Sequence, residues 1–204
     1  MTQTTVRPRV SFEEYIDICA QTDERYELVR GELVKMTPPT WLHTKIAKFL
    51  EQTLDALIKE AGYPWEAFRE TGQRTEYDSS RLPDVAVVPT AEIEEFLNQT
   101  AILTVAAPLV VEIVRRSSAT EDYTDKVREY ETLGIAEYWI VDPEGLGAAK
   151  YIGSPKAPTV TVHQLGDGKY QAKQFRGEEL IESATFKNLN LAANQVFLAG
   201  RRQR

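Results

Sequence analysis

Apolar residues recur at helical spacing in four segments of the chain. In the longest segment Ile46, Leu50 and Leu54 fall on one face, and Gly62 follows it as a suitable C-cap. A serine–glutamate capping box, typical of a helix N-terminus, opens the first segment. The pattern therefore predicts helices over about Phe12–Ala20, Trp41–Ala61, Glu121–Leu133 and Leu191–Leu198.

Shorter apolar or alternating runs, bounded by glycine, proline and aspartate, predict β-strands. The unit from Leu109 to Asp142 reads strand, helix, strand, which predicts a right-handed parallel crossover. The pattern as a whole predicts a mixed α/β fold, with a central mixed sheet flanked by helices and a C-terminal β-meander. The expected strand segments are Arg25–Val29 and Glu32–Met36 as a hairpin, Glu66–Tyr77 as one or two strands, Val85–Val88, Leu109–Val114, Glu137–Asp142, Ala148–Ile152, Thr159–Gln164 and Tyr170–Phe175.

The length and composition predict a single globular domain. The chain has 204 residues, of which 42% are hydrophobic and 27% charged. No apolar run approaches the roughly 20 residues that a membrane span needs, and the N-terminal residues lack the apolar stretch of a signal peptide. Cys19 is the only cysteine, which excludes an intrachain disulfide and a cysteine-based zinc site. We therefore expect a cytoplasmic protein with no membrane partner.

The net charge argues against simple electrostatic binding of nucleic acid. The formal charge is −7 and the isoelectric point is about 5.1, whereas nucleic-acid binders are usually basic. Bound metal ions can neutralise a cluster of carboxylates, and the local field matters more than the sum. The charge therefore leaves a metal-dependent site for nucleic acid open.

Two carboxylates stand where an apolar strand is expected. Glu112 lies inside the run Leu-Val-Val-Glu-Ile-Val, and Asp84 follows Pro83 at the start of another strand. Burying an anion is costly unless it is paired or binds a metal. The alternative is that Glu112 lies on a solvent-exposed face, alternating with Val111 and Ile113. Two carboxylates on adjacent strands can share a Mg²⁺ ion, which acidifies a bound water and stabilises a phosphoryl transition state.

The order and spacing of several short motifs form a more specific signal. With them, the chain resembles the PD-(D/E)XK nuclease superfamily and, more narrowly, the bacterial Uma-two-type restriction-endonuclease-like group, once a domain of unknown function. The motifs are Arg25-Tyr-Glu-Leu-Val-Arg-Gly-Glu32, His43, Pro83-Asp84-Val-Ala-Val-Val, Leu109-Val-Val-Glu-Ile-Val114, Asp122-Tyr-Thr-Asp-Lys126 and Gly134-Ile-Ala-Glu-Tyr-Trp-Ile-Val-Asp-Pro143.

The resemblance implies roles for four residues. Asp84 takes the place of the superfamily's metal-binding aspartate, and Glu112 takes the D/E position. The position of the lysine in the simplest members is occupied here by Val114, and Lys126 on the following helix matches the lysine of the narrower group. Glu27 matches an early acid that adds a metal contact. The resemblance thus implies Mg²⁺ (or Mn²⁺) as cofactor, held by Glu27, Asp84 and Glu112.

The resemblance also implies a restriction-endonuclease-like architecture. It covers about residues 12–143, which would form the nuclease-like core, and a β extension would follow over about 147–190 within one domain of residues 1–204. Members of the group usually carry Ser-Pro after the acid-bearing strand, where this chain has Arg115-Arg116; these arginines either bind phosphate or mark a different substrate. His43 either contacts substrate, acts as a base, or lies on the surface. Asp122 pairs with Lys126 at i,i+4 spacing, an ordinary ion pair that would also orient the lysine.

Three functions compete on these residues. The first is a Mg²⁺-dependent endodeoxyribonuclease, in which Asp84, Glu112 and Lys126 are catalytic and DNA is the partner. The second is a non-catalytic nuclease-like module that binds nucleic acid or protein. The third is a structural protein, which predicts that Glu112 points away from Asp84. Exposed strand edges in the C-terminal part would support a homodimer, an expectation that rests on analogy with other nucleases.

Overall fold

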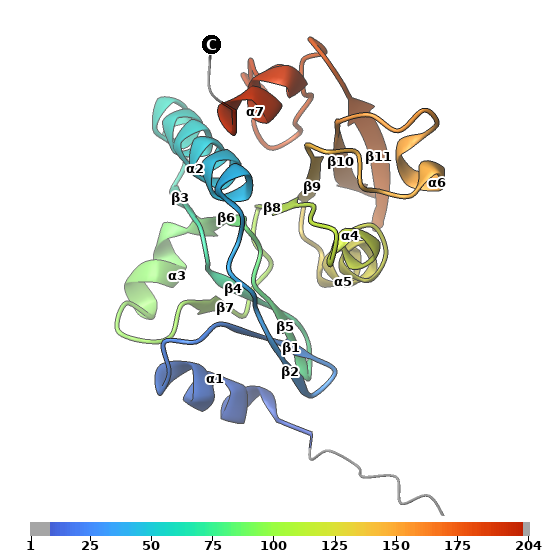
Figure 1. The fold of residues 1–204 in the computed structure, drawn as a ribbon. Helices are drawn as coiled ribbons and strands as arrows, with labels where there is room; N and C mark the ends of the chain where they lie inside the picture. The colour runs from blue at the N-terminus through green and yellow to red at the C-terminus, as the bar shows by residue number, and fades with distance from the viewer. Residues whose placement is uncertain (1–8, 202–204) are drawn as a thin grey trace, which may run out of the picture.

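The computed structural model describes residues 9–201, and these form two mixed sheets flanked by helices (Figure 1). The first sheet has the order β2-β1-β5-β4-β7, and the second has the order β11-β10-β9-β8-β6-β3. The strands are β1 (Tyr26–Val29), β2 (Glu32–Lys35), β3 (Trp65–Phe68), β4 (Gly72–Glu76), β5 (Ser79–Arg81), β6 (Val85–Pro89), β7 (Ile102–Leu103), β8 (Leu109–Ile113), β9 (Glu137–Asp142), β10 (Thr159–Gly166) and β11 (Lys169–Phe175).

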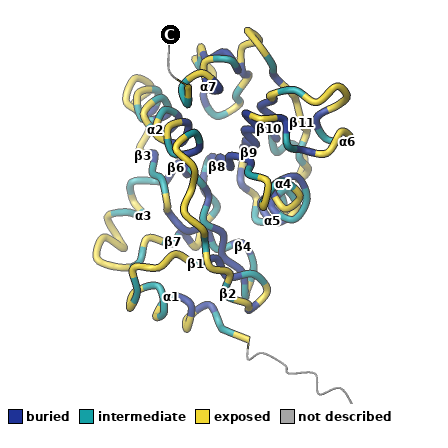
Figure 2. Tube along the Cα trace, in the orientation of Figure 1, coloured by how far each residue is buried: buried dark blue, intermediate teal, exposed yellow. Residues whose placement is uncertain are grey.

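The helices cover both faces of the second sheet, except the first helix, which packs against β1 of the first sheet. They are α1 (Phe12–Ala20), α2 (Trp41–Ala61), α3 (Thr90–Glu95), α4 (Ala119–Asp122), α5 (Asp125–Leu133), α6 (Ala149–Ile152) and α7 (Ala193–Ala199). Alternate residues of β8 point to opposite faces, so Val111 packs with α2 and α7 while Val110 packs with Tyr130 of α5. The central strands β8 and β9 are therefore buried on both sides (Figure 2). Within the described residues, no helix is long and apolar enough to cross a membrane.

The predicted fold class and most predicted elements are confirmed. The helices over residues 12–20 and 41–61 have the predicted bounds, and Gly62 caps the second with a positive φ of 66°. The hairpin β1–β2 forms as predicted, with Val29 paired to Glu32. Strands β8 and β9 pair in parallel, Leu109 opposite Glu137, as the strand–helix–strand unit requires.

Residues 66–77 form two strands, one of the two predicted alternatives, and these strands belong to different sheets. Strand β3 pairs with β6, whereas β4 pairs with β5 and with β7. The chain changes sheet at Glu70, which has a positive φ of 67° and breaks the extended conformation. Strands β10 and β11 of the predicted C-terminal meander pair antiparallel and extend the second sheet from β9.

Two other elements differ from the predicted pattern. The helix expected over residues 121–133 is divided into α4 and α5, because Thr124 adopts non-helical torsion angles and its hydroxyl bonds the carbonyl of Thr120 at 2.7 Å. The strand expected over residues 148–152 is the short helix α6. The carboxylate of Asp142 accepts hydrogen bonds from the backbone N–H groups of Leu146 at 2.9 Å and Gly147 at 2.8 Å. These bonds turn the chain away from the sheet before α6.

Candidate active site

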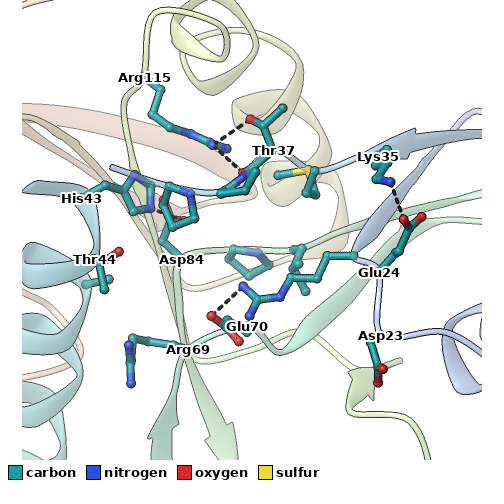
Figure 3. Close-up of a pocket in the computed structure, with 17 residues that line it drawn as sticks. Asp23, Glu24, Lys35, Thr37, His43, Thr44, Arg69, Glu70, Asp84 and Arg115 are labelled. Atoms are coloured by element: carbon teal, nitrogen blue, oxygen red, sulfur yellow. Dashed lines mark hydrogen bonds and ion pairs between the residues drawn. The ribbon is translucent and has the colours of Figure 1, made fainter. Parts of the chain in front are cut away.

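Asp84 stands just before β6, where its side chain is 18% exposed and lines a pocket of about 400 Å³. One carboxylate oxygen accepts the backbone N–H of Ile113 at 2.7 Å. The other lies 2.7 Å from Nε2 of His43, which α2 delivers to the same pocket (Figure 3). His43 is only 6% exposed, so the surface position considered for it is excluded. These contacts fix the orientation of Asp84 at the inner wall of the pocket.

Glu112 lies in β8, next to the strand that Asp84 begins. Strands β6 and β8 are antiparallel with Val85 opposite Val111, so the same register extended by one residue brings Asp84 opposite Glu112. Glu112 is 4% exposed, which excludes the solvent-exposed position weighed from the sequence. The strand pairing therefore brings the two carboxylates opposite each other on neighbouring strands, and their role as a shared site stays a prediction.

Lys126 projects from α5 onto Glu112. Its Nζ lies 2.9 Å from Oε2 of Glu112 and 3.0 Å from Oδ1 of Asp122. The other oxygen of Glu112 accepts the hydroxyl proton of Tyr130 at 2.9 Å. Asp122 in turn accepts from the hydroxyl of Ser118 at 2.7 Å, so the buried charges are all held by partners.

The crowding of acids perturbs the protonation of these groups. Burial raises the pKa of Glu112 above its usual range; Lys126 opposes this shift, while the nearby charges of Asp84, Asp122 and Glu27 add to it. Burial acts to lower the pKa of Lys126, but the surrounding carboxylates outweigh it and hold the pKa well above the usual value. A single lysine thus faces several carboxylates, so negative charge is in local excess. Such an excess favours the binding of a cation.

Glu27 of β1 lies on the other side of this group, in contact with Arg81 of β5. One oxygen accepts from Nη1 of Arg81 at 3.1 Å, and the other accepts the backbone N–H of Leu82 at 3.1 Å. Burial acts to raise the pKa of Glu27, but Lys126 and Arg81 outweigh it and keep the carboxyl ionised. The sequence did not point to Arg81, because no local pattern reveals that a strand arginine will be buried beside an acid that is 54 residues away.

The side chains of Asp84 and Glu112 offer oxygen donors, the kind that Mg²⁺ prefers. Within residues 9–201, no group of three or more histidine, cysteine, aspartate or glutamate side chains is arranged to hold a metal ion. Mg²⁺ in proteins often uses only one or two carboxylates and keeps several waters. Asp84 and Glu112 supply such a pair of oxygen ligands on adjacent strands. The predicted metal contacts of Glu27, Asp84 and Glu112 all stay predictions, since both oxygens of each carboxylate already have partners within the protein.

Comparison with known proteins adds a family to this geometry. A family model described as "Uma2: Putative restriction endonuclease" matches residues 12–194. Five solved chains are similar, among them a "putative nuclease belonging to DUF820" from Anabaena variabilis ATCC 29413. That structure is 18% identical, with a TM-score of 0.72 over 94% of this chain and 99% of that chain. No curated protein matches the sequence.

Both comparisons cover the elements that carry Asp84, Glu112 and Lys126. The solved structure shares its fold with 94% of this chain. The family model extends from the first helix to α7 and so includes β1, β6, β8 and α5, the elements that bring the acids and the lysine together. With its nuclease-like fold and this match, the chain belongs to the Uma2 family.

Proposed function

We propose that the protein is a Mg²⁺-dependent endonuclease that hydrolyses phosphodiester bonds in DNA. The observation that carries the proposal is the antiparallel register of β6 and β8, which brings Asp84 opposite Glu112 with Lys126 on the same glutamate. Family membership and the fold support nuclease chemistry on that site. Mn²⁺ would serve as an alternative ion, because it also prefers carboxylate and water ligands.

Each side chain has a defined task in the proposed mechanism. Asp84 and Glu112 would hold the metal ion, which supplies an acidified water and charge stabilisation when bound. The positive charge of Lys126 would stabilise the negative charge that develops on the phosphate oxygens in the transition state. His43 keeps Asp84 oriented toward the pocket through the 2.7 Å contact, and Tyr130 fixes Glu112 from the opposite side. The pocket beside Asp84 admits the substrate backbone.

A cleavage assay with matched variants tests this proposal. Asp84→Asn and Lys126→Gln should each slow plasmid cleavage in Mg²⁺ at least about 100-fold, since single charge-stabilising groups contribute on that scale. Glu95→Gln, an exposed acid on α3, should cleave at the wild-type rate. Circular dichroism of each variant confirms that it folds. Cleavage by folded Asp84→Asn at the wild-type rate would contradict the assignment of this residue.

A second function is favoured by one observation. Both oxygens of Glu112 already have partners, Lys126 and Tyr130, so the acid is satisfied without a metal. This arrangement suits a module with a nuclease-like fold that binds nucleic acid without cutting it. In that case wild-type protein binds DNA equally well with and without Mg²⁺ and leaves plasmid intact, whereas the endonuclease cuts it only when the metal is present.

A further inference from the structure

The pocket beside Asp84 contains four basic side chains, and three of them are neutralised. Arg25 pairs with Glu70 at 2.6 Å, Arg69 pairs with Glu51 at 2.8 Å, and Lys35 pairs with Glu24. The remaining basic residue, Arg115, has no carboxylate within ion-pair distance among the residues that the structure describes. Its charge is therefore the one in this pocket that is available to an incoming anion.

The contacts of Arg115 leave its guanidinium incompletely used. Nη1 donates to the carbonyl and the hydroxyl of Thr37 at 3.3 and 3.5 Å, both long and both to neutral acceptors (Figure 3). Its Nε is buried and has no hydrogen-bond partner in the described part of the chain. A buried donor without an acceptor carries a free-energy cost that an oxygen ligand removes.

The position of Arg115 relates it to the proposed site. The residue follows β8 by two positions, so the strand that bears Glu112 also places Arg115 at the pocket. Asp84, on the neighbouring strand, lines the same pocket. A ligand that reaches Asp84 through this pocket therefore meets the guanidinium of Arg115 as well.

We infer that Arg115 binds a backbone phosphate of the nucleic-acid substrate, adjacent to the phosphate that reacts at Asp84. The inference rests on the proposed function and adds a substrate-binding residue to it. A guanidinium presents a planar fork of donors that matches two phosphate oxygens. The pocket also contains Asp23, which repels an anion, while Glu24 and Glu70 are paired with basic residues, so the uncompensated arginine supplies the attraction that a phosphate needs.

The alternative role for Arg115 is structural. In that role its only task is to join the end of β8 to the segment containing Thr37. Arg115→Gln separates the two roles, because glutamine keeps a side-chain hydrogen-bond donor but has no charge. Arg115→Lys keeps the charge and loses the fork. Arg116→Gln is the matched control, since its arginine is the next residue, is exposed and does not line the pocket.

The test is the salt dependence of duplex DNA binding, measured by fluorescence anisotropy with Ca²⁺ in place of Mg²⁺ between about 50 and 200 mM salt. Loss of one phosphate contact should lower the magnitude of the slope of log K against log salt by about 0.9 in Arg115→Gln. Arg115→Lys should keep the wild-type slope with weaker binding, and Arg116→Gln should match wild type.

The outcomes separate this inference from the proposed function. An Arg115→Gln slope equal to that of Arg116→Gln would overturn the phosphate contact and leave the nuclease proposal intact. Absence of DNA binding by the wild-type protein would overturn both. If wild type binds DNA, Arg115→Gln shows the predicted change in slope, and wild type cleaves no DNA, the phosphate contact is supported and only the proposed cleavage is refuted. Thermal melting of Arg115→Gln near the wild-type temperature confirms that the variant folds.

Discussion

Glu112 is surrounded by groups that act on its charge in opposite directions. Lys126 and the Tyr130 hydroxyl stabilise the carboxylate, at 2.9 Å each, while Asp84 and Asp122 repel it. A buried ion pair is weak support for stability, because the cost of desolvation offsets much of the attraction between the charges. The arrangement is therefore better explained by a function that needs a poised acid than by its contribution to folding.

His163 gives a prediction at the scale of one residue. Burial lowers its pKa to about 4, and its ring stacks on Tyr138. The unfolded chain takes up a proton below pH about 6.5 while the folded protein does not, so stability should fall as the pH drops from about 6.5 toward 4. Between pH 7 and pH 5 this group should cost about 2 kcal/mol of unfolding free energy.

Urea denaturation at these two pH values measures the effect. The free energy of unfolding of His163→Gln should fall less than that of wild type over the same interval, because glutamine does not titrate. The other histidine, His43, is present in both proteins and contributes equally to each. An identical loss of stability in variant and wild type would show that His163 is protonated in the folded state.

The sequence indicated which residues belong to the candidate site better than it indicated which side chains contact one another. The sequence motifs singled out Asp84, Glu112 and Lys126, and in the structure Lys126 contacts Glu112. The contact of His43 with Asp84 and the pairing of Arg81 with Glu129 join residues 41 and 48 positions apart. Such pairs depend on how whole elements pack, which hydrophobic periodicity does not determine.

Helix α5 connects the two sheets, and its charged residues explain how. Lys126 contacts Glu112 in the second sheet, whereas Glu129 accepts two hydrogen bonds of 2.7 Å from Arg81 in the first sheet. Thr75 of β4 donates to the same glutamate at 3.2 Å. The helix that presents the lysine is therefore held on both sides, and its orientation depends on Arg81.

Removal of Arg81 tests this connection. Arg81→Met should lower the free energy of unfolding by about 3–5 kcal/mol, because Glu27 and Glu129 lose the cation that neutralises them in the interior. Arg116→Met, on the exposed surface, should leave stability unchanged within error. Urea denaturation at neutral pH compares the two, and equal stability of Arg81→Met and wild type would mean that α5 is held in place by apolar packing alone.

Element prediction succeeded where periodicity was strong and failed where a single side chain redirects the chain. The long helix α2 has an uninterrupted apolar face and a glycine cap, and its bounds were predicted correctly. The segment 149–152 became a helix because Asp142 caps the preceding turn, a contact that apolar pattern does not reveal. Helix α3 and strands β5 and β7 are short, so they offer too few residues for a periodic signal.

At the scale of the whole molecule, the net negative charge of the protein opposes the binding of DNA, which is also negatively charged. The net charge of −7 disfavours DNA at long range, and three of the four basic side chains in the pocket are paired with acids. A divalent ion at Asp84 and Glu112 and the guanidinium of Arg115 would together reverse the sign of the field where the substrate binds. The account therefore requires metal binding to precede productive binding of DNA.

Calorimetric titration of Mg²⁺ into the wild-type protein and into Asp84→Ala tests this central claim most directly. The account predicts saturable binding to wild type and its loss in the variant, with both proteins folded by circular dichroism. Absence of Mg²⁺ binding to wild type, or equal binding to Asp84→Ala, would contradict the claim that Asp84 and Glu112 form the metal site.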